Sequence, residues 1–334
     1  MSVTTAERFL ATSSSAGLVV AGIRNPRSLG VSRYAALLAE ALADEGIDYR
    51  LARRAPRLER AHFHLANSSR ELLLDHQRRV APFVVTVHDV VPRTRALRPA
   101  YRVRVYPQLV RGASAVIVHS TFAADLLVQE AGSRPARLEV VPHPARAPRS
   151  TDRLAARAAL GWPYDSLIAV VPGVIKSAKL VRETLSAASG DSRWQVALAG
   201  RLVDRSLLRR ARSHGALVLA DPDHADYERA IVASDCVLCV RSGSVGETNG
   251  PLLDALGSGR AVLATATGSI PETARNAALY CEGTELGIRT GLEQLAGADV
   301  RGELERSAAK RAGELTWEAS ATRHAELFRD VLDG

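Results

Sequence analysis

Two acidic residues flank a turn of small residues in the second half of the chain. Glu247 stands in a polar loop after an apolar run, and Asp254 comes seven residues later. Between them lie Asn249, Gly250 and Pro251, and proline is favoured in the first turn of a helix. The free N–H groups and positive dipole end of such a helix suit an anion such as a diphosphate, and a carboxylate accepts hydrogen bonds from sugar hydroxyls. The alternative is a capped helix with two solvated acids.

Two of the three lysines in the chain lie together in another short segment. Lys176 and Lys179 follow an apolar run, whereas Lys310 lies far away in the sequence. The other 41 basic residues are arginines, so this pair indicates a positional demand for ammonium groups. The alternative is an ordinary surface loop.

The charge is divided unequally along the chain. Residues 1–150 carry 22 Lys and Arg against 12 Asp and Glu, a net charge of +10, whereas residues 151–334 carry 22 against 24, a net charge of −2. The basic half favours an anionic partner, whether a phosphorylated ligand, a lipid surface or a nucleic acid. The alternative is that the arginines reflect the composition of the source genome.

Short apolar runs alternate with helical patterns along the whole chain. A length of 334 residues predicts two domains, and 46% apolar with 24% charged residues is an ordinary globular composition. Strands are predicted over 16–23, 48–53, 60–67, 82–89, 113–120 and 137–144, and then over 166–175, 194–200, 216–221, 235–242 and 261–268. Helices are predicted over 31–46 and 121–132, between 67 and 82, and within the last 34 residues. Further helical patterns lie between the strands of the second half, most clearly over 224–235 and 250–259. This alternation predicts an α/β protein with two doubly wound parallel sheets and ligands at the carboxyl ends of the strands.

The cysteines indicate neither a disulfide framework nor a metal centre. Cys236 and Cys239 form a lone C-x-x-C inside an apolar run, and Cys281 lies apart. A zinc site would need two more ligands nearby, so buried thiols in a reducing compartment are expected. The chain has no run of about 18 uncharged apolar residues and no basic start followed by an apolar block. Neither a transmembrane helix nor a signal peptide is therefore expected.

The segment around Glu247 resembles the donor-site signature of glycosyltransferase family 4, whose members are retaining enzymes of the two-domain GT-B fold. An acid, a small-residue turn, a proline and a second acid are followed by "ALGSGRAVLATATGSIPE". This chain has six residues between Glu247 and Asp254 where the family pattern has seven, and its second acid is Asp rather than Glu. Other segments resemble the family in the same order: "NPRSLGVSRYAALLAEALADEG", "VVTVHD", "ASAVIVHSTFAADLL", "LEVVPHPA", "PGVIKSAKLVRETLSA" and "LTWEASATRHAELFRDVL".

The resemblance implies a GT-B enzyme that moves a hexosyl-type sugar, with retention, from a nucleoside-diphosphate sugar to an acceptor hydroxyl. Residues 1–147 would bind the acceptor, residues 148–316 the nucleotide sugar, and a helix within 317–334 would cross back to the first domain. The acceptor would be a glycan, a lipid-linked molecule or a secondary metabolite. No cofactor, no essential divalent metal and no nucleic acid are expected, and the oligomeric state is left open.

The same resemblance assigns roles to residues. Glu247 would contact the transferred sugar, Asp254 the ribose, and Lys176 and Lys179 the diphosphate. The expected donor contacts are Gly30, Lys176, Lys179, Glu247, Thr248, Asn249, Gly250, Leu252, Leu253 and Asp254, the last few partly through backbone amides. The nucleobase is expected against Val218, Leu219 and Ala220.

Catalytic roles fall to Glu247 and to two residues of the basic half. His88 would contact the donor from the opposing domain, and Asp89 would position the acceptor hydroxyl. His62 and His64 alternate on one predicted strand and therefore share a face. With Asn67 they are either acceptor-binding or core residues, and a metal site there would need a further ligand.

Competing functions differ in what the sequence lacks. A nucleic-acid binder agrees with the pI of about 9.8, but no recognised nucleic-acid motif occurs. A dinucleotide oxidoreductase lacks its G-x-G-x-x-G after the first strand. The remaining alternatives are a GT-B epimerase or phosphorylase and an inactive sugar-nucleotide-binding relative.

A cytoplasmic location is expected. A cluster of arginines suits an anionic acceptor or the inner face of the membrane, namely Arg93, Arg95, Arg98, Arg102 and Arg104.

Overall fold

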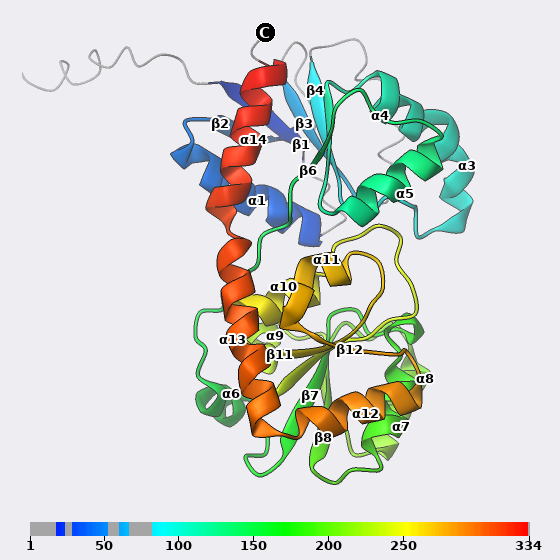
Figure 1. The fold of residues 1–334 in the computed structure, drawn as a ribbon, viewed down its shortest axis with the longest axis vertical. Coiled ribbons are helices and arrows are strands. Elements are labelled where there is room, and N and C mark those ends of the chain that lie inside the picture. The colour runs from blue at the N-terminus through cyan, green and yellow to red at the C-terminus, as the bar shows by residue number, and fades with distance from the viewer. Residues whose placement is uncertain (1–17, 24–28, 53–59, 67–81, 333–334) are drawn as a thin grey trace, which may run out of the picture.

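Two α/β halves make up the protein, each built around a six-stranded parallel sheet. The computed structural model describes residues 18–23, 29–52, 60–66 and 82–332. The halves are stacked along the longest axis of the molecule, and a long C-terminal helical stretch runs beside both of them (Figure 1).

The N-terminal sheet has the strand order β2-β1-β3-β4-β5-β6. Its strands are β1 (Val19–Ile23), β2 (Asp48–Ala52), β3 (Ala61–Leu65), β4 (Phe83–Val87), β5 (Ala115–Val118) and β6 (Leu138–Val140). Every residue of β3, β4 and β5 is buried, as expected for strands that carry helices on both faces. The order reverses between β1 and β3, which places a ligand crevice at the carboxyl ends of these strands.

Helices cover both faces of this sheet. They are α1 (Leu29–Asp44), a broken helical run of η2 (Arg95–Leu97), α3 (Arg98–Ala100), η3 (Tyr101–Val105) and α4 (Tyr106–Arg111), and then α5 (Thr121–Ala131). The side chain of Ser120 caps α5 by accepting a hydrogen bond from the amide of Ala123, and Gly132 ends the helix with a φ of +74°.

The C-terminal sheet has the strand order β12-β11-β10-β7-β8-β9. Its strands are β7 (Leu167–Pro172), β8 (Trp194–Gly200), β9 (Leu217–Ala220), β10 (Cys236–Cys239), β11 (Ala261–Thr265) and β12 (Leu279–Cys281). The order reverses between β7 and β10. The loops that follow these two strands are therefore neighbours, and they carry the lysine pair and Glu247.

The C-terminal half is rich in helices. They are α6 (Arg153–Leu160), η4 (Ser177–Lys179), α7 (Val181–Ala188), α8 (Arg205–Ser213), α9 (His224–Ala233), α10 (Gly250–Gly257), α11 (Ile270–Ala274), η5 (Arg275–Ala277), α12 (Glu285–Leu295) and α13 (Ala298–Glu314). Two apolar clusters, one on each face of the sheet, form the core of this half.

The last helix, α14 (Trp317–Leu332), returns to the N-terminal half and packs against α1. Phe328 is fully buried there, in the same apolar cluster as Leu38 and Leu42 of α1. The guanidinium of Arg329 donates a hydrogen bond at 2.5 Å to the backbone carbonyl of Glu45, just after α1. The chain thus crosses between the halves twice, once before α6 and once before α14.

The predicted α/β class with two doubly wound parallel sheets is confirmed. Each predicted strand contains an observed one, usually shortened at its ends. The sequence analysis missed β12, the broken helical run over 95–111, and the helices α6, α11 and α12. The helix expected between 67 and 82 lies almost wholly outside the described residues. Cys236 and Cys239 lie buried in β10, as predicted, and burial raises the pKa of the Cys239 thiol to about 12.

A buried ion pair joins α6 to the centre of the C-terminal sheet. Arg157 and Asp235 form the pair, and their side chains are 4% and 7% exposed. The Asp235 carboxylate also accepts a hydrogen bond at 2.7 Å from the amide of Ile168 in β7. The Arg157 guanidinium donates to the carbonyl of Ala233 at 2.9 Å. Arg153 also lies 3.4 Å from the Asp235 carboxylate, so Asp235 has a second cation. Removal of Asp235, by contrast, leaves the buried Arg157 guanidinium without a carboxylate partner.

We expect the change Asp235→Ala to lower the free energy of unfolding by about 3–5 kcal/mol, the usual effect of leaving one member of a buried ion pair. The measurement is urea denaturation followed by circular dichroism. Asp48→Ala is the matched control, because Asp48 pairs with Arg50 at the surface and its side chain is 46% exposed. This control should cost less than about 1 kcal/mol. Equal effects of the two changes would contradict the role of the buried pair.

Candidate functional site

Two loops meet beside the switch point of the C-terminal sheet, where its strand order reverses between β7 and β10. The lysine loop follows β7 and carries Lys176 and Lys179, and the acid loop follows β10 and carries Glu247. The loop after β7 leads into η4, and the loop after β10 leads into α10. The amide of Ser242 in the second loop donates a hydrogen bond at 3.1 Å to the carbonyl of Ala178 in the first. Gly173, at the start of the first loop, has a φ of +89°, and a Cβ there would lie 3.3 Å from both Lys179 Nζ and the ring of Pro251. The chain therefore needs glycine where the lysine and the start of α10 approach each other.

The two lysines have different surroundings. Lys179 points its Nζ back onto the carbonyl of Pro172, the last residue of β7. Burial, assisted by the nearby charges of Arg241 and Lys176, lowers the pKa of Lys179 to about 8. Burial together with Arg93 and Arg241 also lowers the pKa of Lys176, although Glu247 and Asp89 oppose this. Both ammonium groups lie in a field that is already positive, which an anion would relieve.

Glu247 is a buried and charged carboxylate. It is 6% exposed, pairs with the Arg241 guanidinium, and accepts hydrogen bonds from the hydroxyl of Ser244 at 2.8 Å and the amide of Val245 at 2.7 Å. Burial alone would raise the pKa of Glu247, but Arg241, Arg93 and the Val245 amide hold it below its usual value. The carboxylate is therefore ionised at neutral pH. In this conformation its partners are protein groups.

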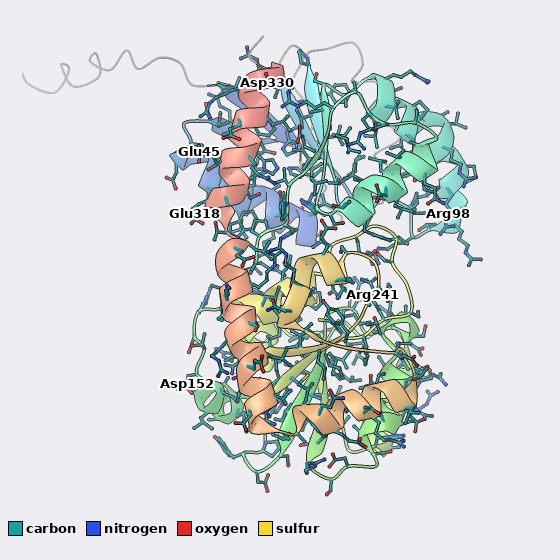
Figure 2. All side chains as sticks on the ribbon, in the orientation of Figure 1. Glu45, Arg98, Asp152, Arg241, Glu318 and Asp330 are labelled. Atoms are coloured by element: carbon teal, nitrogen blue, oxygen red, sulfur yellow. The ribbon has the colours of Figure 1, made fainter. Side chains whose placement is uncertain are left out.

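The acid loop is joined directly to the N-terminal half. The carbonyl of Val245 accepts hydrogen bonds from the amides of Val90 at 3.1 Å and Val91 at 2.9 Å. Arg93 lies between the carboxylates of Asp89, at 3.0 Å, and Glu247, at 3.5 Å. Arg93 was expected in a surface cluster; instead it bridges the two halves. Arg241 lies near their junction, and Arg98 lies at the outer surface of the N-terminal half (Figure 2).

The start of α10 has the predicted cap but offers fewer free amides than expected. The side chain of Asn249 caps the helix by accepting from the amide of Leu252 at 3.4 Å. The amides of Leu252 and Leu253 also donate to the Asn249 carbonyl, at 3.1 and 3.2 Å, and both leucine side chains are buried in the core. These two amides are therefore engaged within the cap in this conformation, and their contact with a donor stays a prediction. Gly250 and the half-buried Thr248 remain as backbone candidates at this helix end.

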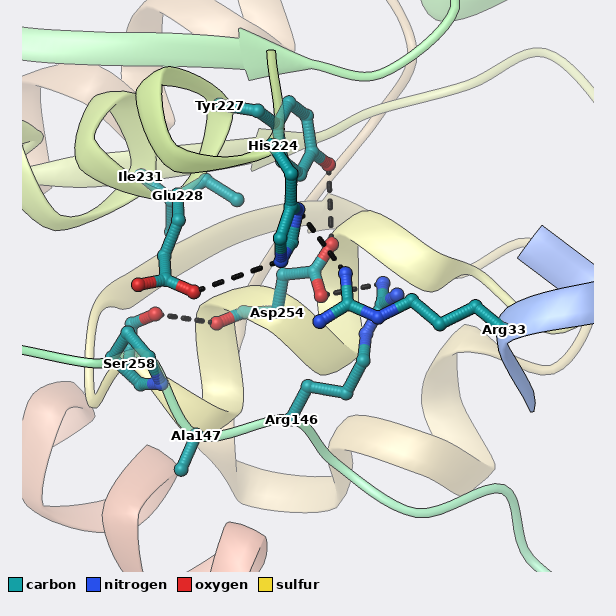
Figure 3. A pocket seen from close by; sticks show the side chains of 10 residues that line it. Arg33, Arg146, Ala147, His224, Tyr227, Glu228, Ile231, Asp254 and Ser258 are labelled. Carbon is teal, nitrogen blue, oxygen red and sulfur yellow. Dashed lines mark hydrogen bonds and ion pairs between the residues drawn. The ribbon is translucent and has the colours of Figure 1, made fainter. Parts of the chain in front are cut away.

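Asp254 lies one turn further along α10 and is held on both oxygens. Its carboxylate pairs with Arg146 at 2.5 Å and accepts a hydrogen bond from the Tyr227 hydroxyl at 3.1 Å. Burial raises the pKa of Asp254, although Arg146 and Tyr227 counteract it. Figure 3 shows these groups at a small pocket where α1, the linker, α9 and α10 converge. There Arg33 of α1 donates a hydrogen bond at 3.1 Å to the Nδ1 of His224 on α9.

His88 follows β4 directly and lies at the carboxyl edge of the N-terminal sheet. It is 8% exposed. Its Nε2 lies 3.1 Å from His64 Nδ1, and its Nδ1 lies 3.2 Å from His119 Nε2. Both ring nitrogens are therefore engaged by other histidines. A contact between this side chain and a donor stays a prediction.

The other candidate residues of the N-terminal half are placed as follows. His62 and His64 are 0% and 3% exposed and lie in the core beneath α1 and α14. Their burial agrees with the core alternative, and the acceptor alternative stays a prediction. Asn67 lies outside the described residues. Gly30 was expected in a loop but belongs to the first turn of α1, and a Cβ there would meet nothing within 4 Å.

The predicted nucleobase residues lie on an edge strand. Val218 and Leu219 are half-buried and Ala220 is exposed at the end of β9. Asp221 follows with a φ of +47°, and its amide donates at 3.0 Å to the carbonyl of Gly200. Ala220, at the end of β9, and the lysine loop, which follows β7, both lie at the carboxyl ends of the strands of this sheet. No group of His, Cys, Asp and Glu suited to a metal ion occurs within the described residues.

Four further residues contact the two acids of the site, and the sequence analysis predicted none of these contacts: Arg93, Arg146, Tyr227 and Arg241. Arg241 carries a usable signal, because it is the first polar residue after the apolar run of β10. Arg146 and Tyr227 reach Asp254 from a linker and from a different helix. Such a meeting depends on tertiary packing, so local sequence holds no signal for it.

Comparisons with known proteins agree with the predicted family. Residues 49–146 match the family described as Glycosyltransferase Family 4. The D-inositol 3-phosphate glycosyltransferase of Mycobacterium tuberculosis is 29% identical, with an alignment that covers 81% of this chain and 61% of the relative. The chain thus spans less than two thirds of the length of these curated relatives. The resemblance to glycosyltransferase family 4 is confirmed.

Solved structures show the same fold at low sequence identity. Sucrose-phosphate synthase from Thermosynechococcus elongatus superposes with a TM-score of 0.75 at 15% identity, covering 94% of this chain and 99% of that one. The Anabaena protein HepE, solved with UDP and glucose, has a TM-score of 0.71 at 13% identity, with coverage of 93% and 99%. The predicted GT-B fold is therefore confirmed.

The cluster of buried histidines predicts how stability depends on pH. Burial lowers the pKa of His64 to about 3 and the pKa values of His119 and His324 to about 4, and it also lowers those of His62 and His88. An unfolded histidine has a pKa of about 6.5. The unfolded chain therefore binds more protons below that pH, and stability falls as the pH decreases from about 6.5 toward 4.

We expect the free energy of unfolding to fall by about 1.4 kcal/mol per pH unit for each histidine that stays neutral, and thus by several kcal/mol between pH 7.5 and pH 5. Urea denaturation at the two pH values measures this. His214→Ala is the control for the substitution itself, because His214 lies exposed after α8 and outside the buried cluster, and the loss of stability between the two pH values should persist in this variant. Equal stability at the two pH values would contradict the burial of neutral histidines.

Proposed function

We propose that this chain, a relative of glycosyltransferase family 4 with the GT-B fold, is a retaining glycosyltransferase. It would move a hexosyl-type sugar from a nucleoside-diphosphate sugar to an acceptor hydroxyl. The observation that carries the proposal is the meeting of the lysine loop with the acid loop and the start of α10 at the switch point. The relatives support the donor class, since one is named as a glycosyltransferase and HepE was solved with UDP and glucose.

The cations of the site suit the departure of a diphosphate. As the bond to the sugar breaks, negative charge grows on the leaving phosphate while the sugar becomes oxocarbenium-like. Lys176 and Lys179 come from the loop after β7 and would stabilise that charge more strongly in the transition state than in the ground state. The pKa of Lys179, about 8, leaves this group mostly charged at neutral pH. An approaching diphosphate would raise that pKa further.

The acids suit the neutral parts of the donor. Glu247 is held by Arg241 and Arg93, and it would accept hydrogen bonds from hydroxyls of the transferred sugar. Asp254 would accept from the ribose hydroxyls, with Arg146 and Tyr227 fixing the orientation of its carboxylate. A carboxylate that is already oriented loses less conformational freedom when the ligand binds.

The N-terminal half would supply the acceptor side. Asp89 lies at the carboxyl edge of β4 and is paired with Arg93, close to the Glu247 loop. We assign it the positioning of the acceptor hydroxyl. The hydrogen bonds from Val90 and Val91 to Val245 hold the two halves together at this point, which would exclude water from the reacting groups.

The acceptor itself is proposed only as a class, namely a glycan, a lipid-linked molecule or a secondary metabolite, with anionic character. Exposed arginines of the broken helical run, Arg95, Arg98 and Arg104, face solvent and suit such a partner or an anionic membrane surface. Within the described residues, no helix has the length and apolarity needed to cross a bilayer. We expect neither a nucleic acid partner nor a requirement for a divalent metal.

A panel of ligands tests the proposed donor. Nucleoside diphosphates and their sugars should raise the melting temperature, since a ligand at 100 times its Kd adds about 2.7 kcal/mol to the stability of the folded state. Nucleosides without phosphate should have much smaller effects. Stabilisation by random-sequence DNA, with none by any nucleotide, would overturn the proposal in favour of nucleic-acid binding. Donor binding without transfer to any acceptor would identify an inactive relative.

The lysine pair provides the sharper test. The double change Lys176→Ala with Lys179→Ala should lower kcat/KM by at least about 2 kcal/mol, or about 30-fold, because two charged contacts to the leaving group are lost. Lys310→Ala is the matched control, since Lys310 is the third lysine and lies exposed on α13. It should leave kcat/KM unchanged. Full activity of the double variant, with an unaltered melting temperature, would exclude this role for the lysines.

A further inference from the structure

Four buried histidines form a continuous hydrogen-bonded chain under α1 and α14. His119 Nδ1 lies 2.9 Å from the backbone carbonyl of Val141, and its Nε2 lies 3.2 Å from His88 Nδ1. His88 Nε2 lies 3.1 Å from His64 Nδ1. His62 and His64 belong to β3, whereas His88 follows β4 and His119 follows β5. The series of hydrogen bonds therefore runs across three neighbouring strands toward the carboxyl edge of the sheet.

The chain continues through a tyrosine to a fourth histidine. The hydroxyl of Tyr49 lies 2.9 Å from His64 Nε2 and 2.7 Å from His62 Nδ1. His62 Nε2 lies 2.7 Å from the hydroxyl of Thr86. Every ring nitrogen of the four histidines therefore has one partner within the chain.

One carbonyl determines the direction of all these bonds. The oxygen of Val141 only accepts, so His119 must carry its proton on Nδ1. A neutral imidazole then has a lone pair on Nε2, which accepts from the Nδ1–H of His88. By the same reasoning His88 Nε2 is an acceptor and His64 donates to it from Nδ1. The bonds can be satisfied in only one order.

The remaining links obey the same rule without conflict. His64 Nε2 accepts from the Tyr49 hydroxyl, whose oxygen accepts from the Nδ1–H of His62. His62 Nε2 then accepts from the Thr86 hydroxyl. All four histidines are thus Nδ1–H tautomers, although in water the neutral ring prefers its proton on Nε2. Protonation of His119 or His88 would place two N–H donors face to face, because the acceptor nitrogen of each of these rings faces the Nδ1–H of another histidine.

The residues around the four histidines form an apolar environment that favours the neutral form of each ring. Tyr34 from α1 packs its ring against His64, His88 and His119 at centroid distances of 5.7, 4.9 and 5.3 Å. His324 and Phe328 from α14 pack against His62. His143, which follows β6, packs against His119, and burial lowers its pKa as well. Among the described residues, none of the four histidines has an ion pair with a carboxylate.

We propose that His119 and His64 are positioning residues that hold His88 as the Nδ1–H tautomer in one fixed orientation at the carboxyl edge of the N-terminal sheet. His88 then meets a ligand as a neutral ring whose basic nitrogen is turned inward to His64. It is therefore not the general base or acid of the reaction. This inference rests on the proposed function only for its kinetic part, since the tautomer is a property of the free protein.

Nitrogen NMR of the full chain labelled with ¹⁵N-histidine tests the tautomer directly, because two-bond couplings distinguish the protonated ring nitrogen from the bare one. We expect His88, assigned by comparison with His88→Gln, to carry its proton on Nδ1 and to stay neutral from pH 8 to pH 6. A proton on Nε2, or titration of His88 within that range, would overturn the proposal.

Two variants of His119 separate the link to His88 from the link to Val141. The amide of His119→Gln reaches the place of Nε2 and keeps an acceptor for His88, whereas the shorter His119→Asn reaches only the place of Nδ1. We expect the Gln variant to keep the Nδ1–H tautomer and a kcat within about threefold of the parent. The Asn variant should lose the tautomer and lower kcat about 100-fold with little change in KM, the scale of a misplaced group at a reacting centre.

The outcomes distinguish this inference from the proposed function. If the tautomer is found but no nucleotide sugar supports transfer, the positioning stands and the function fails. If transfer is active but His88 keeps its tautomer and kcat in the Asn variant, the positioning is wrong and the function stands. Equal loss of kcat in the Gln and Asn variants, with equal loss of melting temperature, would reduce His119 to a structural residue and would also overturn the proposal.

Discussion

A carboxylate that stays charged inside the protein holds the candidate site together. Glu247 is almost fully buried, and a buried carboxylate is tolerated only where cations and N–H groups surround it. Arg241 comes from its own loop and Arg93 from the opposite half. One side chain therefore orders the loop after β10 and ties it to the other half. The placement of α10 beside the lysine loop follows from this order, because α10 begins three residues after Glu247.

The two halves satisfy their buried polar groups in opposite ways. In the C-terminal half, charges are paired, as in Arg157 with Asp235 and Arg146 with Asp254. In the N-terminal half, the buried polar groups are neutral and their hydrogen bonds run in one direction from Thr86 to Val141. Paired charges tolerate an incoming anion by exchanging partners, whereas a neutral chain resists any added charge. The paired charges of the C-terminal half therefore suit an anionic ligand better than the neutral histidines of the N-terminal half do.

The strands and the helix cap were predictable because local physics determines them. Strands buried on both faces read as apolar runs, and the turn from Asn249 to Pro251 begins a helix by capping and by the fixed φ of proline. The short β12 and the broken run over 95–111 lack a long regular pattern and were missed. The sequence also did not predict which side chains pack against one another in three dimensions. His62 and His64 read equally well as core or cleft residues, because strand alternation tells that they share a face and not what covers that face.

The charges around the site favour an anionic ligand over a neutral one. Among the described residues, the cations outnumber the carboxylates there: Arg33, Arg93, Arg146, Lys176, Lys179 and Arg241 face Asp89, Glu228, Glu247 and Asp254. The cost of this excess is visible in the lysines, whose pKa values are lowered by burial and by neighbouring guanidinium groups. A neutral acceptor would leave that repulsion in place. An anion such as a diphosphate would relieve it, and the energy so released would be available for binding.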